Sequence, residues 1–468
     1  MNRGTSILIK LKEEHKEFAQ SYRLNSIIRE HSNFLDYPIY VAETDTGGEG
    51  DELEWKQANE RLALWRKSSK DVTEEQYKSF YQNLSFDYSG EPMMRLHLQT
   101  DVPLQLYSLL FVPSKRDWRL FRSDEDYGLK LYVRKVLIID KFKDILPPYL
   151  RFVQGVVDSE DLPLNVSRQM VQDSPLVKKI SEVLIGRISN ELKRMAKNEP
   201  EKYKTFWKEF GIFIKEGVAS DFRNKDKWVE LLRFCSSHSP TPDDTFSIQD
   251  YLGRMKEGQE AIYYVMGDNF NSLKHSPHLD YFRKHNIEVL LFTEPVDSYM
   301  LLNIGEVEGK SFKNIDDADL ELPKGDEASE EKAEDSKLAD DAFISLKSRV
   351  KQVLGDKIAD VRESKVLSDS ACRLVNPSGG MDATMQRLQR MMGEQFQENK
   401  RILELNSKSP FIKELSNRLE TSVNDPLINP LIEQLFESAL VAEGIHPNPS
   451  EMLPRIQKLM EAALGMKS

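Results

Sequence analysis

The sequence lacks long hydrophobic runs and has little cysteine. No segment approaches the roughly 18 uninterrupted apolar residues that a membrane-spanning helix needs, and candidates such as Leu104–Pro113 have only the length of a strand. The apolar stretch near the N-terminus is short and interrupted by charges, unlike a secretory signal. Only two cysteines occur, Cys235 and Cys372, too few for a disulfide framework or a structural zinc site. We therefore expect a cytoplasmic protein with no membrane partner.

The chain also lacks an excess of positive charge. Its formal net charge is -12, which argues against nucleic acid as the main partner. Residues 316–341 hold 12 acidic and 3 basic residues, so the rest of the chain carries a net charge of only -3. This acidic tract has no aromatic residue and almost no apolar periodicity, which is typical of a flexible linker. We expect it to separate a middle domain, 1–315, from a C-terminal domain, 342–468.

The first 315 residues have the patterns of a mixed α/β fold. Alternating apolar residues at 94–98, 104–112 and 129–138 predict an antiparallel sheet, and helical periodicity predicts a long helix over 174–196. The strand–helix–strand order over 261–292 predicts a small β-α-β layer. We expect three parts in sequence order: a larger α/β part over 1–160, a helical connector over 161–240 and a small α/β part over 241–315.

The C-terminal domain is expected to be α+β, with two closing helices. Helix-start signals precede both helices, at Asn424–Pro426 and at Asn448–Glu451. Both helices have wide apolar faces, and they can bury them by pairing with a second copy as a four-helix bundle. The alternative is that these faces dock onto their own domain. The residues that we expect at a homodimer interface are Leu431, Leu435, Phe436, Leu440, Ile456, Leu459 and Met460.

Common catalytic and metal-binding motifs are missing or incomplete. The segment GEVEGKS, Gly305–Ser311, resembles a phosphate-binding loop but has three residues between its glycines where four are needed, so a turn between strands is favoured. Cys235 and His238 form a lone pair of possible ligands, which favours a buried thiol beside a surface imidazole. Neither HExxH nor GxSxG occurs. We expect no metal site and no self-sufficient catalytic centre.

One polar segment is a candidate for phosphate chemistry. Asn165, Arg168 and Gln172 interrupt an otherwise apolar stretch, and in a helix Arg168 and Gln172 would share one face. An arginine flanked by amides suits a phosphate, because the guanidinium is planar, always charged and bidentate. From residue types alone, a structural salt bridge for Arg168 is the stronger alternative.

The same segment resembles a known family. DSEDLPLNVSRQMVQ (Asp158–Gln172) is similar to the middle-domain signature of the 90-kilodalton heat-shock chaperones. Because the chain has no C-terminal MEEVD, it resembles the bacterial high-temperature protein G type or an organellar one. Five further stretches match in the same order, and together they span nearly the whole chain: Arg23–Val41, Leu106–Pro113, Leu129–Asp140, Phe292–Leu301 and Arg401–Asn406.

The resemblance implies an incomplete ATPase. Family members begin with an ATP-binding domain, and Gly4–Phe18 looks like the junction where that domain ends, so we expect a middle plus C-terminal portion. The resemblance places Arg168 where the family's arginine reaches the γ-phosphate, with Asn165 and Gln172 shaping the same loop. ATP and Mg²⁺ are therefore expected only through the missing domain. This chain alone is expected to bind no cofactor and to hydrolyse no ATP.

Client proteins need an adaptable apolar surface. A candidate helix follows the glycine-rich hinge at 376–380, and methionine side chains suit varied partners. The alternative is that this stripe packs into the domain core. Trp65, in a stretch that reads as exposed, is a second candidate. The helix residues expected to contact clients are Met381, Met385, Leu388, Met391, Met392 and Phe396.

Two functions are therefore compared. The first is a dimeric chaperone portion that binds non-native proteins and supplies an arginine to an ATPase. The second is a structural dimerisation and interaction scaffold with no link to nucleotide. A nucleic-acid binder is disfavoured, since the chain has no basic stripe.

Overall fold

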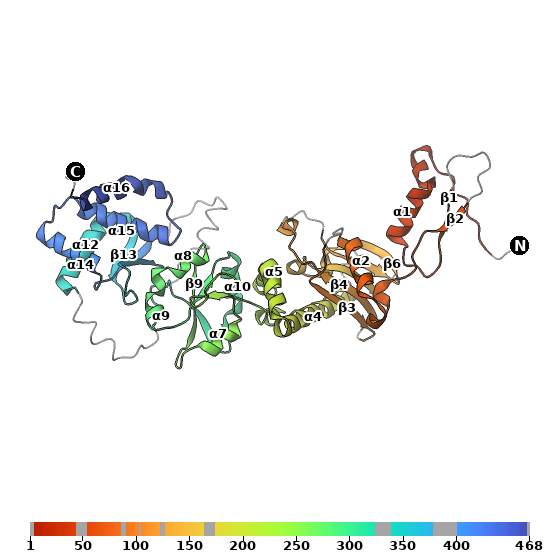
Figure 1. Cartoon of the computed structure of the whole chain (residues 1–468), viewed down its shortest axis with the longest axis horizontal. Coiled ribbons are helices and arrows are strands. Elements are labelled where there is room, and N and C mark those ends of the chain that lie inside the picture. The colour runs from red at the N-terminus through yellow and green to blue at the C-terminus, as the bar shows by residue number, and fades with distance from the viewer. Residues whose placement is uncertain are drawn as a thin grey trace. The chain divides into compact units, whose positions relative to one another are not determined.

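The computed structural model describes eight stretches of the chain, namely residues 4–43, 54–85, 90–102, 104–121, 127–162, 174–322, 338–377 and 400–465. Contacts divide it into two compact units, Met1–Phe213 and Ile214–Ser468. Figure 1 follows the chain from red at the N-terminus to blue at the C-terminus. The mixed α/β fold class expected from the sequence is confirmed. The division of the chain into a middle domain over 1–315 and a C-terminal domain over 342–468 stays a prediction.

The first unit is built on a five-stranded mixed sheet with strand order β3-β4-β7-β5-β6. All neighbouring strands are antiparallel except β5 and β7, which are parallel. Gly155 lies in β7 with a φ of 151°, and a Cβ atom there would come within 2.3 Å of the Leu109 carbonyl oxygen of β4. The strands are β3 (Met94–Thr100), β4 (Leu106–Val112), β5 (Leu129–Val133), β6 (Val136–Phe142) and β7 (Gln154–Ser159).

Helices and a separate hairpin complete this unit. Strands β1 (Tyr40–Glu43) and β2 (Glu54–Gln57) pair only with each other. The long helix expected over 174–196 is α4, which begins after Ser174, whose hydroxyl accepts a hydrogen bond from the Leu176 N–H. The other helices are η1 (Glu13–Ala19), α1 (Ser21–His31), η2 (Leu64–Arg66), η3 (Ser69–Asp71), α2 (Glu74–Ser85), η4 (Trp118–Phe121), η5 (Lys143–Ile145), η6 (Pro148–Leu150), α4 (Pro175–Asn198) and α5 (Pro200–Ser220).

The second unit begins with the expected small α/β layer. Strands β9 and β10 are parallel, as are β9 and β12, and the sheet order is β11-β12-β9-β10-β8. The GEVEGKS segment forms the β11–β12 hairpin, in which Glu308 and Gly309 both have positive φ, so the turn interpretation is confirmed. The elements are α6 (Lys225–Val229), β8 (Cys235–Ser236), α7 (Ile248–Arg254), β9 (Ala261–Met266), α8 (Phe270–Lys274), η7 (Pro277–Leu279), α9 (Asp280–Lys284), β10 (Leu290–Phe292), α10 (Val296–Ile304), β11 (Glu306–Val307) and β12 (Lys310–Asn314).

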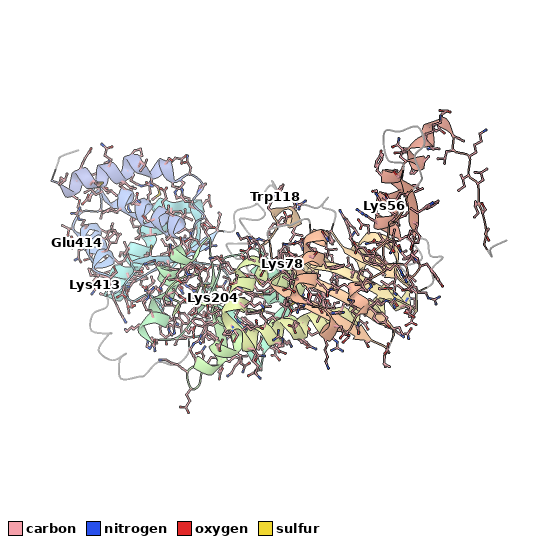
Figure 2. All side chains as sticks on the ribbon, turned by 45° about the vertical axis from the view of Figure 1, so that its right-hand side comes forward. Lys56, Lys78, Trp118, Lys204, Lys413 and Glu414 are labelled. Atoms are coloured by element: carbon pink, nitrogen blue, oxygen red, sulfur yellow. The ribbon has the colours of Figure 1, made fainter. Side chains whose placement is uncertain are left out.

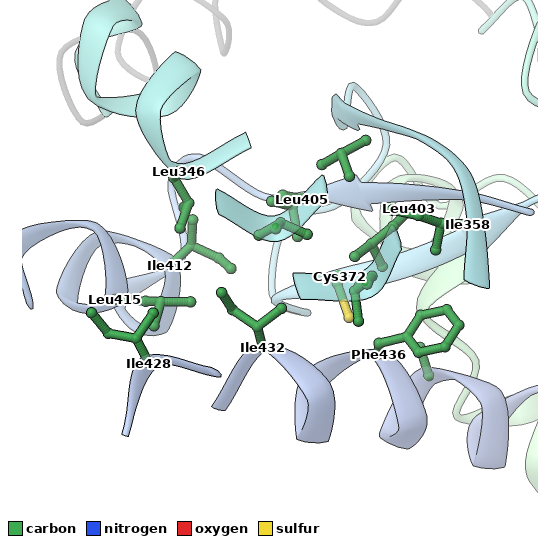
Figure 3. Packing of buried hydrophobic residues seen from close by; sticks show 14 of the residues in the cluster. Leu346, Ile358, Cys372, Leu403, Leu405, Ile412, Leu415, Ile428, Ile432 and Phe436 are labelled. Carbon is green, nitrogen blue, oxygen red and sulfur yellow. The ribbon is translucent and has the colours of Figure 1, made fainter. Parts of the chain in front are cut away.

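The C-terminal domain of this unit packs helices on a three-stranded sheet, β13-β15-β14. Figure 3 shows its core, in which Cys372 and Leu403 of the sheet face Ile432 and Phe436 of helix α15. The elements are α12 (Asp340–Leu354), η9 (Gly355–Lys357), β13 (Ile358–Glu363), β14 (Cys372–Val375), β15 (Arg401–Leu405), α14 (Pro410–Thr421), α15 (Ile428–Ala442), η10 (Pro449–Met452) and α16 (Leu453–Ala463).

The linker expected over 316–341 is wrong at both of its ends. Asp316 is only 5% exposed, the neighbouring Asp317 forms a β-bridge with Asn376, and helix α12 already begins at Asp340. Composition predicts the behaviour of a segment from its own residues alone. Here basic and amide side chains from the C-terminal domain compensate the charge of Asp316. Residues 323–337, the middle of the tract, lie outside the described part of the chain.

In the part of the chain that the structure describes, no helix is long and apolar enough to cross a lipid bilayer. Apolar side chains are nevertheless exposed in several places. Figure 2 labels one of them, Trp118 of η4, which is 67% exposed.

Candidate functional site

The three residues expected to act on phosphate, Asn165, Arg168 and Gln172, lie outside the described residues. The structure does describe the two elements that flank this segment in the sequence. Strand β7 leads into the segment through Asp158–Leu162, and α4 follows it from Pro175. The approach is well anchored, because the Asp161 carboxylate accepts a hydrogen bond from the Gln105 N–H and the Ser159 hydroxyl donates to the Gln105 carbonyl.

Asp158 is the buried anchor at the end of β7. Its carboxylate is fully buried and accepts hydrogen bonds from the Trp65 indole N–H at 2.9 Å and from Arg66 Nε at 2.7 Å. Arg66 also pairs with Glu160 and lies over the Tyr107 ring. Burial disfavours the charge on Arg66, but the hydrogen bonds that Arg66 donates to Asp158 and Glu160 and the negative charge of both carboxylates outweigh this and leave the guanidinium pKa above its ordinary value. Two residues far away in sequence therefore hold the strand that precedes Arg168.

The exposure expected for Trp65 is wrong. Its side chain is 0% exposed, and its ring packs against Phe34, Tyr132 and Phe80 with centroid distances of 4.6, 4.8 and 5.9 Å. The charged neighbours Arg66 and Lys67 made the stretch read as a surface segment. The short helix η2 instead turns Trp65 inward, where its polar N–H finds the Asp158 carboxylate. In this arrangement Trp65 offers no surface to a client protein.

The methionine-rich candidate helix, residues 381–396, also lies outside the described residues. Both flanking segments are described, and both contact Asp316. Asn376 Nδ2 donates to Asp316 Oδ2 at 2.7 Å, and Arg401 Nη1 lies 3.6 Å from the same oxygen. Asp316 directly follows β12 of the small layer, so this carboxylate joins that layer to the two strand ends of the C-terminal sheet that flank residues 378–399.

Asp316 belongs to a buried charge cluster that also contains His278, Arg373, Arg401 and Glu443. His278 Nε2 lies 2.6 Å from Glu443 Oε1, and Arg373 Nη1 lies 3.3 Å from His278 Nδ1. Burial raises the pKa of Asp316 to about 6 against the opposing pull of Arg401 and His278. Burial acts in the same direction on Glu443, but His278 and Arg401 outweigh it and hold the Glu443 pKa below its ordinary value. The cluster joins the small layer to the end of helix α15.

An apolar face that sequence reasoning missed lies on helix α10. Tyr299 is 44% and Leu302 is 81% exposed, although Met300 and Leu301 between them are buried. Phe222, which is 72% exposed, lies on the turn after α5. Asn303 Nδ2 joins the end of α10 to the last turn of α5 by donating to the carbonyls of residues 218 and 219. The sequence of α10 has no continuous polar face. Such a pattern is also typical of a fully buried helix, so it did not predict an exposed apolar face.

The residues expected at the dimer interface fall into two groups. Phe436 is 5% exposed and belongs to the core of its own domain, so this side chain offers little surface to a second copy. Leu431, Leu435 and Leu440 are partly buried against the same core. The reason is that α15 directs its face of Ile428, Ile432, Phe436 and Ala439 at the sheet. On α16, by contrast, Ile456 and Leu459 are half-buried and Met460 is 63% exposed.

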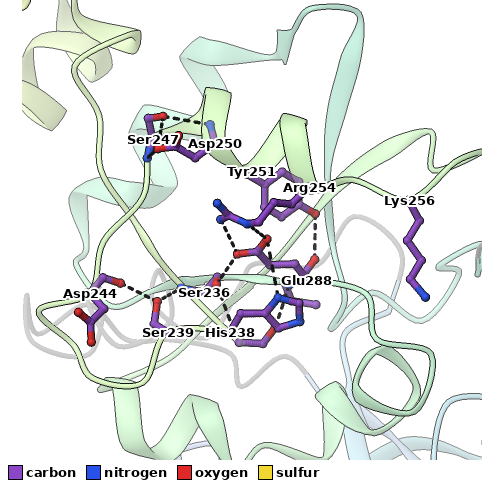
Figure 4. A network of polar contacts seen from close by, with 12 residues as sticks. Ser236, His238, Ser239, Asp244, Ser247, Asp250, Tyr251, Arg254, Lys256 and Glu288 are labelled. Atoms are coloured by element: carbon purple, nitrogen blue, oxygen red, sulfur yellow. Dashed lines mark hydrogen bonds and ion pairs between the residues drawn. The ribbon is translucent and has the colours of Figure 1, made fainter. Parts of the chain in front are cut away.

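A second polar network surrounds Ser236 in the small layer. Figure 4 shows Glu288 between Ser236 and Arg254, with Ser236 Oγ donating at 2.6 Å and the guanidinium forming two bonds of 2.8 Å. The Ser236 hydroxyl therefore faces a carboxylate rather than the nearby His238 ring. Burial raises the pKa of the neighbouring Cys235 thiol to about 11, which leaves it almost entirely protonated at neutral pH. Among the described residues, no three His, Cys, Asp or Glu side chains are grouped so as to hold a metal ion.

The fold and the segments described above agree with a family of known proteins. Residues 48–468 match the family model described as "Hsp90 protein". The chain therefore belongs to the Hsp90 family, the 90-kilodalton heat-shock proteins, and the resemblance drawn from the sequence is confirmed.

Individual relatives point to the bacterial branch. The chain is 39% identical to the chaperone protein HtpG of Shewanella loihica over 475 residues, which cover 99% of this chain and 73% of that protein. It is 37% identical to HtpG of Actinobacillus succinogenes and 36% identical to HtpG of Vibrio cholerae, with 98% of this chain and 72% of each relative covered. The chain is thus a chaperone-family protein similar to HtpG.

Replacement of Asp158 tests the support of the candidate loop. Asp158→Asn removes the charge that Arg66 and Trp65 face in a buried site, and breaking such a pair costs about 3–5 kcal/mol. We expect the free energy of unfolding, measured by urea denaturation, to fall by that amount. The control is Glu74→Gln, which breaks an exposed ion pair with Arg95 and is expected to change stability little. Equal effects of the two substitutions would show that Asp158 is not an anchor.

Proposed function

We propose that this chain is a chaperone portion that binds non-native proteins, works as a homodimer and contributes Arg168 to an ATPase site. Membership of the Hsp90 family supports the chaperone activity in general. The observations that support client binding in this chain are the exposed apolar side chains Tyr299 and Leu302 of α10 and Phe222 after α5. Soluble proteins rarely group large apolar side chains at the surface without a partner. A non-native protein, with its own apolar segments exposed, is a partner that such a face fits.

The neighbourhood of this face supports the proposal. Lys215 is buried below it and pairs with Asp297 at the start of α10, at 2.7 Å. At the opposite end of the helix, Lys225 Nζ at the start of α6 donates to the Asn303 carbonyl, and Asn303 Nδ2 donates to the end of α5. The helix is therefore fixed at both ends, so the exposed side chains belong to a rigid element. The methionine-rich segment, including Met385, Met392 and Phe396, stays a second proposed client surface.

Polar replacements on α10 test client binding. Tyr299→Ser, Leu302→Ser and Phe222→Ser together should weaken the suppression of client aggregation by at least about tenfold, because each buried apolar side chain contributes about 1.5–3 kcal/mol. The melting temperature should stay close to wild type, since all three side chains are exposed in the free protein. The control is Val102→Ser, another exposed apolar residue, which should leave suppression unchanged. If the triple variant suppressed client aggregation as well as wild type does, these residues would be excluded as a client-binding surface.

Dimerisation is proposed through α16 together with the adjoining part of α15. The side chains that the single chain leaves exposed there are Val441, Leu453, Met460 and Leu464, at 44%, 63%, 63% and 79%. Deletion of both closing helices would be a poor test, because Ile428, Ile432 and Phe436 of α15 belong to the core of their own domain. Substitutions on α16 avoid this problem.

The dimer is therefore tested with Leu453→Glu and Met460→Glu. The double variant should weaken self-association at least about 100-fold, since charged groups replace apolar contacts at the centre of the proposed interface. Sedimentation velocity measures the change as a shift from dimer to monomer with unaltered circular dichroism. Ile344→Glu on α12, an exposed apolar residue of the same domain, should leave the dimer intact. A dimer in the double variant would move the interface elsewhere.

The arginine proposal concerns a site that needs a nucleotide-binding domain. The family resemblance gives Arg168 its role, and ATP and Mg²⁺ would bind to that other domain. In this chain, the anchoring of β7 through Asp158 supports the proposal, because an arginine must be positioned accurately to contact a phosphate.

A fusion to the ATP-binding domain of a relative tests Arg168. The fusion should hydrolyse ATP. Arg168→Ala should lower its ATP turnover by up to about 10³-fold, with little change in nucleotide affinity. Arg168→Lys should restore little, because an ammonium group cannot reproduce the planar fork. Wild-type turnover of Arg168→Ala would return this residue to the role of a structural salt bridge.

The alternative is a nucleotide-independent scaffold. It predicts that the chain self-associates but neither suppresses client aggregation nor supports an ATP turnover that depends on Arg168. A cytoplasmic location and the absence of a nucleic-acid partner stay predictions from the sequence.

A further inference from the structure

Helix α16 is weakly anchored by apolar contacts. None of its residues from Leu453 to Ala463 is buried within the chain, and Leu453 and Met460 are 63% exposed. The two buried apolar residues that precede it most closely in the sequence are Ile445 and Met452. Hydrophobic burial is in any case non-directional, so it does not by itself determine the angle at which a helix leaves its neighbour.

A polar contact holds α16 to α15 instead. Arg455, on the first turn of α16, is 17% exposed in its side chain. Its Nη1 donates to Glu433 Oε2 at 2.9 Å, and its Nε donates to Gln434 Oε1 at 3.3 Å. Its Nη2 contacts Glu437. All three guanidinium nitrogens therefore contact acceptors on α15, and we call these four residues the Arg455 seam.

The seam is unusual in its balance of charge. Glu433 and Glu437 are four residues apart on α15, so they lie on the same face, where like charges repel. The His446 ring is also close to Glu437, with Nε2 lying 3.6 Å from Oε2. Arg455 lies between the two carboxylates and is the cation that contacts both of them. Without it, Glu437, which is 15% exposed, would lose its main partner.

The geometry of the contact restricts the helix. A guanidinium is a rigid planar fork, and three acceptors along one face of α15 fix its position and its rotation together. In some coiled coils, a single polar contact specifies the register of the helices at a cost in stability. The other end of α15 is fixed independently, because Gly444 ends the helix with a Schellman motif and Glu443 binds His278.

We propose that Arg455 is a positioning residue that sets the direction of α16 relative to α15 and thereby the geometry of the interface with a second copy of this chain. The inference rests on the proposed dimer. It assigns the specificity of that dimer to the Arg455 seam and its affinity to the exposed apolar side chains of α16.

Spin-label distances within one chain test the positioning. Labels are placed at Asn429→Cys on α15 and Lys458→Cys on α16, both exposed positions. Cys235 and Cys372 react slowly, because burial raises their thiol pKa values to about 11 and about 12. Labelled chain is mixed with excess unlabelled chain, so that only the distance within one chain is measured. Wild type should give one narrow distance.

Arg455→Met keeps the apolar stem and removes the fork. The distance distribution should become about twofold broader, and self-association should weaken about tenfold, because the two carboxylates of the seam are left unpaired. Arg455→Lys should be intermediate, since a single point charge cannot reach three acceptors. Glu437→Gln, a milder change, should broaden the distance in the same direction. It serves as the second variant if Arg455→Met does not fold.

The matched control is Arg418→Met on α14, whose guanidinium contacts Glu414 and Asp425 and takes no part in the seam. It should leave both the distance and the dimer unchanged. A dimeric wild type with an unchanged distance distribution in the Arg455 and Glu437 variants would overturn the inference alone. A monomeric wild type would overturn the proposed dimer and the inference with it.

Discussion

The second unit depends on the charge cluster around Asp316. One carboxylate at the end of β12 contacts Asn376 and Arg401, which flank residues 378–399 of the C-terminal domain, while His278 joins the same cluster to Glu443 at the end of α15. Such a buried cluster is stable only when its opposite charges are paired, because burial removes each charged group from its hydrating water. The small layer and the C-terminal domain are therefore held together by matched charge rather than by a large apolar contact alone.

The position of the cluster has a structural reason. In parallel α/β layers, ligands bind outside the carboxyl ends of the strands, where the strand order reverses. Here the order β12-β9-β10 provides such a reversal, and the chain after β12 enters the cluster. Arg373 donates to the Ile315 carbonyl at this edge and Arg401 approaches Asp316. Side chains of the C-terminal domain thus contact the edge that could otherwise take a small ligand.

The exposed apolar surface is distributed in a way that fits two kinds of partner. On α10, Tyr299 and Leu302 are exposed on a helix whose two ends are held by polar contacts. On α16, the apolar residues lie on a helix oriented by a single polar seam, which suits a specific partner such as a second copy. In both places polar contacts hold the helix to its neighbours, and large apolar side chains are exposed.

The sequence by itself determined the family, the mixed α/β class, the small β-α-β layer and α4, because local periodicity and the Asp158–Gln172 signature are properties of neighbouring residues. It could not determine which way a side chain points when its partner is distant in the sequence. The buried Trp65 donates its indole N–H to Asp158, and Asp316 contacts Asn376 and Arg401. Phe436 packs against the sheet in the core of its own domain. Only the tertiary structure decided these three, since burial and charge compensation depend on residues brought together by folding.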